Sequence, residues 1–75
     1  MIDITPGWLH KHNLDSWEVE STVGYYVYRV YRHAEHSMRM VAEAAISKPV
    51  YDALKTDRAK REMIYDALRR EMDET

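Results

Sequence analysis

The sequence predicts an all-α fold: a short N-terminal helix, a long central helix and a C-terminal helix that folds back antiparallel. Three observations favour this fold. Apolar residues recur at steps of three or four throughout residues 15–46, which places them on one side of a helix. Residues suited to capping a helix precede each of the three segments. The six residues 50–55 (VYDALK) recur as IYDALR at residues 64–69, an offset that keeps both blocks on one helix face.

Residues 1–75 are assigned to a single small domain, which begins with a tail at residues 1–4 and a short helix at residues 5–13. Thr5 is a good helix cap, and Pro6 suits the first helical position because a backbone N–H would have no helical partner there. A cluster of large apolar side chains is expected where this helix meets the next segment: Trp8, Leu9, Leu14 and Trp17.

Residues 15–46 are predicted to form the central helix. Asp15 or Ser16 can cap its first backbone N–H groups, and the first turn carries negative charge, which the helix dipole favours. On such a helix one stripe is apolar over the whole length: Val19, Val23, Val27, Val30, Ala34, Met38, Val41 and Ala45.

The same stretch also fits a β-hairpin, and this alternative gives an α+β fold with a hairpin at residues 16–32 followed by two helices. Residues 17–21 alternate between apolar and polar, and residues 25–31 are rich in tyrosine and valine, which favour strands. Gly24 would suit a turn and costs a helix about 1 kcal/mol relative to alanine. However, the connection lacks an Asn-Gly or Asp-Gly pair. The helix is therefore the preferred interpretation.

The C-terminal helix is predicted at residues 48–72. Ser47 can cap it, and Pro49 would lie in its first turn, where proline is tolerated. Residues 55–62 are polar except for one alanine, so the helix could instead break there, with Thr56 capping its second half.

The composition excludes several function classes. The chain has no cysteine, so disulfides and thiolate metal sites are excluded. With 11 basic and 13 acidic residues its net charge is −2, which does not by itself indicate nucleic-acid binding. No run of about 20 apolar residues exists to cross a membrane, and the N-terminus lacks the pattern of a secretory signal. We therefore expect a cytoplasmic protein with no membrane partner.

Catalysis and metal binding are not expected either. Only two glycines are present, so no glycine-rich loop is available to cradle a phosphate. A chain of this size struggles to enclose a substrate pocket of about 300 Å³. The four histidines, His10, His12, His33 and His36, do not show the spacing of a zinc site. We therefore predict that the protein binds no metal, no cofactor and no small-molecule substrate.

The length of the central helix predicts a homodimer. A helix of about 30 residues is about 45 Å long, whereas a compact domain of this size is roughly 30 Å across. A second copy would cover the overhang by packing against the apolar stripe. The residues assigned to self-association are Val19, Val23, Val27, Val30, Met38 and Val41.

The function predicted from these features is a small non-enzymatic protein-binding module that regulates, inhibits or scaffolds a partner, as phage-type host-directed factors do. Tyrosine and arginine are frequent hot-spot residues, and they gather on the other side of the central helix. The partner-binding candidates are Tyr25, Tyr28, Arg29, Arg32, His36 and Arg39. The alternative is a small dimeric nucleic-acid-binding regulator that uses the same Tyr/Arg helix face.

Overall fold

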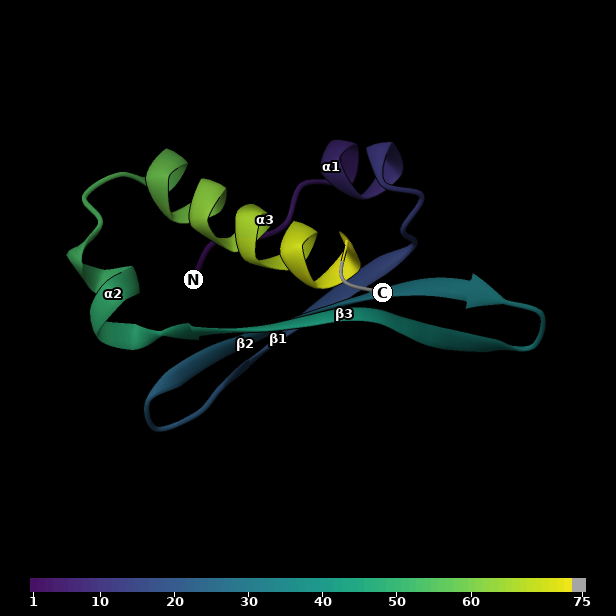
Figure 1. Cartoon of the computed structure of the whole chain (residues 1–75), viewed down its shortest axis with the longest axis horizontal. Coiled ribbons are helices and arrows are strands. Elements are labelled where there is room, and N and C mark those ends of the chain that lie inside the picture. The colour runs from purple at the N-terminus through teal and green to yellow at the C-terminus, as the bar shows by residue number, and fades with distance from the viewer. Residues whose placement is uncertain (74–75) are drawn as a thin grey trace.

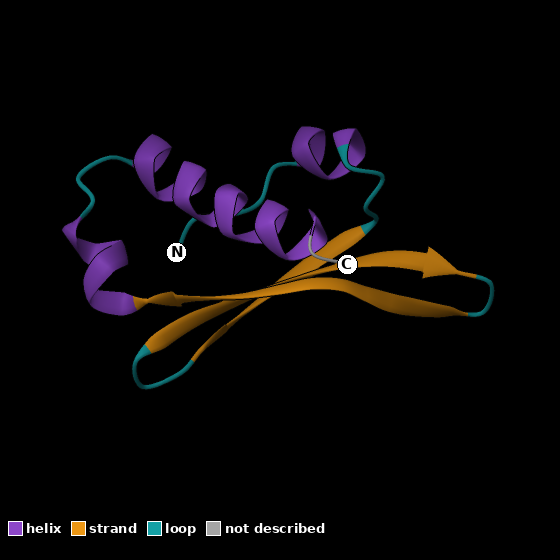
Figure 2. Ribbon diagram, in the orientation of Figure 1, coloured by secondary structure: helices purple, strands orange, loops and turns teal. Residues whose placement is uncertain are grey.

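The computed structural model describes residues 1–73 and contains helices on one side of a three-stranded antiparallel sheet with the strand order β1-β2-β3. Helices α1 and α3 lie over one face of the sheet, and α2 continues from the end of β3 (Figure 1). Figure 2 shows the same arrangement by type of element. In chain order the elements are α1 (Pro6–Lys11), β1 (Ser16–Ser21), β2 (Tyr25–Ala34), β3 (Ser37–Ser47), α2 (Lys48–Ala53) and α3 (Asp57–Asp73).

The predicted all-α fold is wrong, and the α+β alternative fits. The segment 15–46, expected to be one helix, instead contains β1 and β2 and nearly all of β3. The alternative hairpin at residues 16–32 corresponds to β1 and β2, although β3 had been expected to be helical. The physical reason is that this segment is rich in valine and tyrosine. Its apolar residues therefore match the helical spacing of three or four residues and also the strand spacing of two. Tertiary packing on one sheet face then favours the strands.

Two tight turns connect the strands without an Asn-Gly or Asp-Gly pair. In the first turn, the Thr22 hydroxyl accepts a hydrogen bond from the Tyr25 amide (3.1 Å) and donates one to the Tyr25 carbonyl (3.1 Å). This side chain replaces the usual hairpin turn chemistry. In the second turn, Glu35 has a left-handed backbone with φ of 49°. The hydrogen bonds of Thr22 therefore stabilise the β1–β2 turn, although this turn lacks the Asn-Gly or Asp-Gly pair that is common in hairpins.

Register alternation gives the sheet a covered face and an open face. Tyr28 and Val30 on β2 point toward the helices and are fully buried, and Val30 pairs with Ala42 on β3. The register then shifts, so that Tyr31 pairs with Met40 and one extra residue, Val41, forms a bulge in β3. Each strand therefore alternates between the two faces on either side of the bulge.

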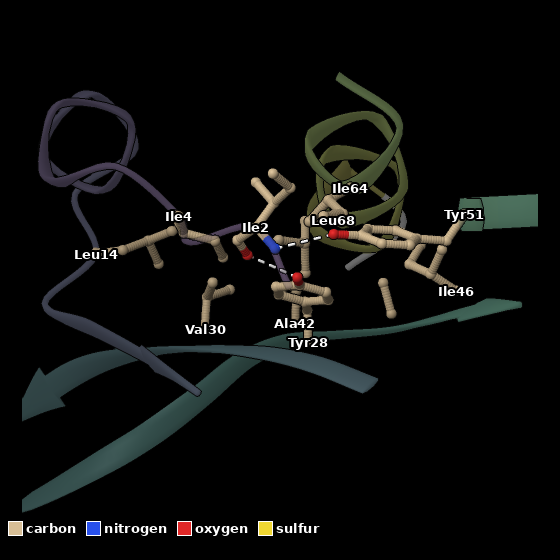
Figure 3. Close-up of a cluster of buried hydrophobic side chains, with 11 residues drawn as sticks. Ile2, Ile4, Leu14, Tyr28, Val30, Ala42, Ile46, Tyr51, Ile64 and Leu68 are labelled. Carbon is tan, nitrogen blue, oxygen red and sulfur yellow. Dashed lines mark hydrogen bonds between the residues drawn. The ribbon is translucent and has the colours of Figure 1, made fainter. Parts of the chain in front are cut away.

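The core lies between the sheet and α3, and the N-terminal segment runs through it (Figure 3). The Tyr28 hydroxyl donates a hydrogen bond to the Ile2 carbonyl (2.7 Å), and the Ile2 amide donates one to the Tyr51 hydroxyl (3.0 Å). The predicted tail is thus a docked arm. The buried residues are Ile2, Ile4, Leu14, Tyr28, Val30, Ala42, Ala44, Ile46, Tyr51, Ile64 and Leu68.

The segment 48–72, expected to be one helix, forms two helices, α2 and α3. The break falls at residues 54–56, and Thr56 starts α3 by accepting a hydrogen bond from the Ala59 amide on its hydroxyl (3.1 Å). The two repeated hexapeptides consequently belong to different helices. Tyr51 enters the core, whereas Tyr65 stacks on Trp8 with ring centroids 4.5 Å apart.

The molecule measures 40 × 25 × 22 Å, and the end of the β2–β3 hairpin projects along its long axis past α3 (Figure 1). Because no long central helix exists, the overhang that predicted a homodimer does not exist either. Any self-association must use a different surface from a helical stripe.

Candidate interaction surface

The sheet face opposite the helices is the largest feature left uncovered in the part of the chain that the structure describes (Figure 2). We call it the open face. Strand alternation and the pairing of β1, β2 and β3 assign its side chains. They are Ser16, Glu18, Glu20, Tyr25, Val27, Arg29, Tyr31, His33, Met38, Met40, Glu43 and Ala45.

The β2 row and its neighbours on β3 form the apolar part of the open face. Tyr25 is 51% exposed, and Val27 and Tyr31 are half-buried between the flanking strands. Met40, which pairs with Tyr31, and Met38 are 50% and 44% exposed. At the projecting end of the β2–β3 hairpin, the Tyr31 ring thus lies next to the flexible thioethers of Met38 and Met40, whereas Tyr25 lies at the opposite end of β2.

Carboxylates surround the single arginine of the open face. The Arg29 guanidinium contacts Glu43 on β3 (2.6 Å) and Glu20 on β1 (3.0 Å). Glu43, and then Glu20, raise the pKa of Arg29 by accepting its hydrogen bonds. The Tyr31 hydroxyl donates a hydrogen bond to Glu18 on the same face. The positive charge of Arg29 is therefore neutralised within the sheet.

The six partner-binding candidates do not share one face. Tyr25 and Arg29 lie on the open face, whereas Tyr28 is fully buried in the core. Arg32 and Arg39 are cross-strand partners on the helix side of the sheet, and His36 lies in the turn between β2 and β3. The structure thus makes direct neighbours of Arg32 and Arg39 alone. Tyr25 and Arg29 share a face but are four residues apart along β2, and Tyr28 and His36 lie elsewhere.

The six self-association candidates are likewise divided. Val19 and Val30 point toward the helices, and Val27 and Met38 lie on the open face. Val23 is fully exposed in the first turn, and Val41 is the bulge residue of β3, so neither residue has a partner in the strand pairing. A single apolar stripe through them does not exist.

Residues that the sequence analysis did not select complete the open face. Tyr31, Met40 and the three glutamates belong to it because of strand alternation. The sequence feature that indicates such a face is the alternation of Glu18 and Glu20 with the apolar Trp17 and Val19 in β1. That signal favours a strand with one solvated face.

No group of three potential metal-ligating side chains occurs among residues 1–73. None of their helices combines the length and apolar character needed to cross a membrane. A pocket of about 320 Å³ lies on the helix side of the projecting hairpin, lined by Arg32, Ala34, Arg39, Met40 and Val41.

Comparisons with known proteins give no functional information, because no protein-family model, no curated protein and no solved structure matches this chain.

Proposed function

We propose that this chain is a small non-enzymatic protein-binding module that regulates, inhibits or scaffolds a partner protein through the open face of its sheet. The observation that carries the proposal is the cluster formed on that face by the exposed Met38 and Met40 and the half-buried Tyr31, which pairs with Met40. The proposal includes a cytoplasmic location, which the absence of cysteine supports.

The composition of this cluster supports protein binding. The uncovered face of an antiparallel sheet is normally polar, because water solvates it. Tyrosine and methionine are enriched in protein interfaces, and methionine adapts its shape to irregular partners. Exposing two neighbouring methionines beside Tyr31 therefore costs solvation free energy that a partner would recover by covering them.

The edge of β3 supports the same proposal. β3 has 11 residues and lies at the edge of the sheet, so one row of its backbone N–H and C=O groups has no strand partner among residues 1–73. It contains no lysine or proline, which commonly protect edge strands, and its protective features are the Val41 bulge and the charges of Arg39 and Glu43. A partner strand can add to such an edge. A second copy of this chain is one suitable partner, because antiparallel pairing of two identical strands is compatible with twofold symmetry.

The nucleic-acid alternative has less support, because the Tyr/Arg helix face that suggested it does not form. Arg29 is paired with Glu20 and Glu43, and Glu18 lies on the same face. These carboxylates would repel a phosphate backbone. A nucleic-acid binder would show affinity that falls steeply with salt.

Affinity capture from lysate of the source cells, combined with light scattering, tests the proposal. Met40→Asp should remove a stoichiometric protein partner, or a dimer of this chain, because it places a charge in the apolar cluster. Val50→Asp is the matched control: Val50 is 52% exposed, close to the 50% of Met40, but belongs to α2. Equal effects of the two substitutions, or no partner and no dimer for the wild type, would refute the proposal.

A further inference from the structure

Two arginines face each other across the projecting end of the β2–β3 hairpin. Arg32 and Arg39 are direct cross-strand partners, so their side chains leave the sheet on the same side. This is the helix side, opposite the open face. Both side chains line the pocket of about 320 Å³, together with Ala34, Met40 and Val41.

The guanidinium of Arg32 is fixed by the end of α1. Its Nε donates a hydrogen bond to the Asn13 carbonyl (2.8 Å), and its Nη2 approaches the His12 carbonyl (3.4 Å). Asn13 itself has a left-handed backbone (φ of 57°), which ends the helix and turns its carbonyl toward the hairpin. Three of the five guanidinium N–H groups of Arg32 remain available after these contacts.

Neither arginine forms an ion pair with any carboxylate of residues 1–73, in contrast to Arg29, Arg58 and Arg69. Like charges placed directly opposite each other on neighbouring strands are destabilising. The hairpin therefore carries a like-charge pair that no ion pair among residues 1–73 neutralises, although the carbonyls of His12 and Asn13 accept hydrogen bonds from Arg32. A bound anion between the two groups would offset it.

We propose that Arg32 and Arg39 form a binding site for an oxyanion, either a phosphate group or a carboxylate. A guanidinium presents parallel N–H donors that match two oxygens of such a group. The fixed Arg32 would supply one fork and the freer Arg39 the other. Val41, the half-buried bulge residue of β3, contributes apolar surface to the same pocket.

The proposal does not depend on partner binding by the open face, because both arginines leave the sheet on the side opposite that face. Met40 is the one residue that contributes to both features. The proposal assigns a role to Arg39, for which the structure gives no hydrogen bond or ion pair among residues 1–73, and a second role to Arg32, which also binds the end of α1. Both are exposed, so an anion from solution can reach them.

Nuclear magnetic resonance of the full-length chain tests the site directly. Inorganic phosphate should shift the Nε–Hε signals of Arg32 and Arg39 in a saturable manner, beyond any shift caused by sodium chloride at the same ionic strength. A parallel titration with acetate separates the two sources: saturation by phosphate alone indicates a phosphate-bearing ligand, and saturation by both indicates that carboxylates also bind. Saturation by neither salt would overturn the proposal.

Three variants locate the site. Arg39→Gln should weaken phosphate binding at least tenfold, and Arg39→Lys, which keeps the charge but loses the fork, should weaken it less. Arg58→Gln makes the same charge change on the first turn of α3, where Arg58 pairs with Glu62, and should leave binding unchanged. Equal phosphate affinity in Arg39→Gln and wild type would contradict the proposal. Because Arg39→Gln removes a repulsion, its thermal midpoint in chloride should not fall.

Discussion

At the scale of single residues, two tyrosine hydroxyls hold the N-terminal arm in the core. Tyr28 binds the carbonyl of Ile2, and Tyr51 binds its amide, so both backbone polar groups of this buried residue are satisfied. Burial, and after it the nearby Tyr51 and Asp3, raise the pKa of Tyr28 to about 12. Burial also raises the pKa of Tyr51.

These shifts predict a loss of stability at alkaline pH. A tyrosine whose pKa is higher in the folded chain than the unfolded value of about 10 favours the folded state fully below pH 10. That contribution disappears as the pH rises from about 10 to about 12, because the unfolded chain then loses the proton first. The free energy of unfolding should fall by about 2 kcal/mol over this range, measured by urea denaturation at each pH.

Tyr28→Phe provides the control for this prediction. The variant should be less stable at pH 7 by about 1–3 kcal/mol, because the Ile2 carbonyl loses its buried donor. Its stability should then depend less on pH above 10 than that of the wild type, since only Tyr51 still titrates with a raised pKa. An unchanged alkaline slope would show that Tyr28 is not the group responsible.

At the scale of elements, the stretch from residue 15 to residue 46 shows how one apolar pattern can serve two structures. Val19 and Val23, or Val23 and Val27, are four apart and would stack on a helix. In the sheet Val19 packs inward, Val23 is exposed in a turn and Val27 lies on the open face. The spacing of the apolar residues fits a helix and also strands. Contacts between neighbouring strands therefore determine that this segment forms a sheet.

Thr56 caps the N-terminus of α3. Thr56→Ala removes the hydroxyl that accepts from the Ala59 amide, and it should lower the free energy of unfolding by about 1 kcal/mol. Thr56→Ser keeps the acceptor and should stay within a few tenths of a kcal/mol of the wild type. Urea denaturation of the three proteins measures both. If the alanine and serine variants are equally stable, the cap contributes nothing.

At the scale of the whole molecule, stability is distributed unevenly along the sheet. The half of the β2–β3 hairpin next to α3 contains Tyr28 and Val30 in the core, whereas its projecting half contains exposed residues such as Met38 and Met40. Local opening is expected where few apolar contacts hold a segment. The Arg32–Arg39 repulsion lies in the same projecting half.

Hydrogen exchange should reveal this division. The hydrogen-bonded amides of residues 31–40 should exchange at least tenfold faster than those of residues 26–30 and 42–46, because their opening does not require the core to unfold. Addition of phosphate should slow exchange in residues 31–40 if the proposed oxyanion site is occupied. Uniform protection along the whole hairpin would show that it opens only with the entire domain.

The candidate surface was predicted only in part. Tyr25 and Arg29 were selected, and the structure places both on the open face. Tyr28 was selected for its residue type, yet its position in the strand points it into the core, where it is fully buried. Arg32 and Arg39 were selected as members of a helical stripe, whereas their actual relation is direct cross-strand pairing. Residue type therefore helped to select candidates. The side of the sheet to which each side chain points could be predicted only by assigning the segment to strands, whose side chains alternate, and not to a helix.

The sequence by itself determined a few local features: Thr5 as a helix cap, the start of a helix after Ser47 and the absence of disulfides. Thr56 as a second cap was given only as the alternative to one helix over residues 48–72. These depend on a few neighbouring residues, so they can be read without the fold. The tertiary structure decided whether residues 15–46 became a helix or strands, and hence which side chains face water. That choice depends on pairing between β2 and β3 and on covering one sheet face with α3, contacts between residues far apart in the chain.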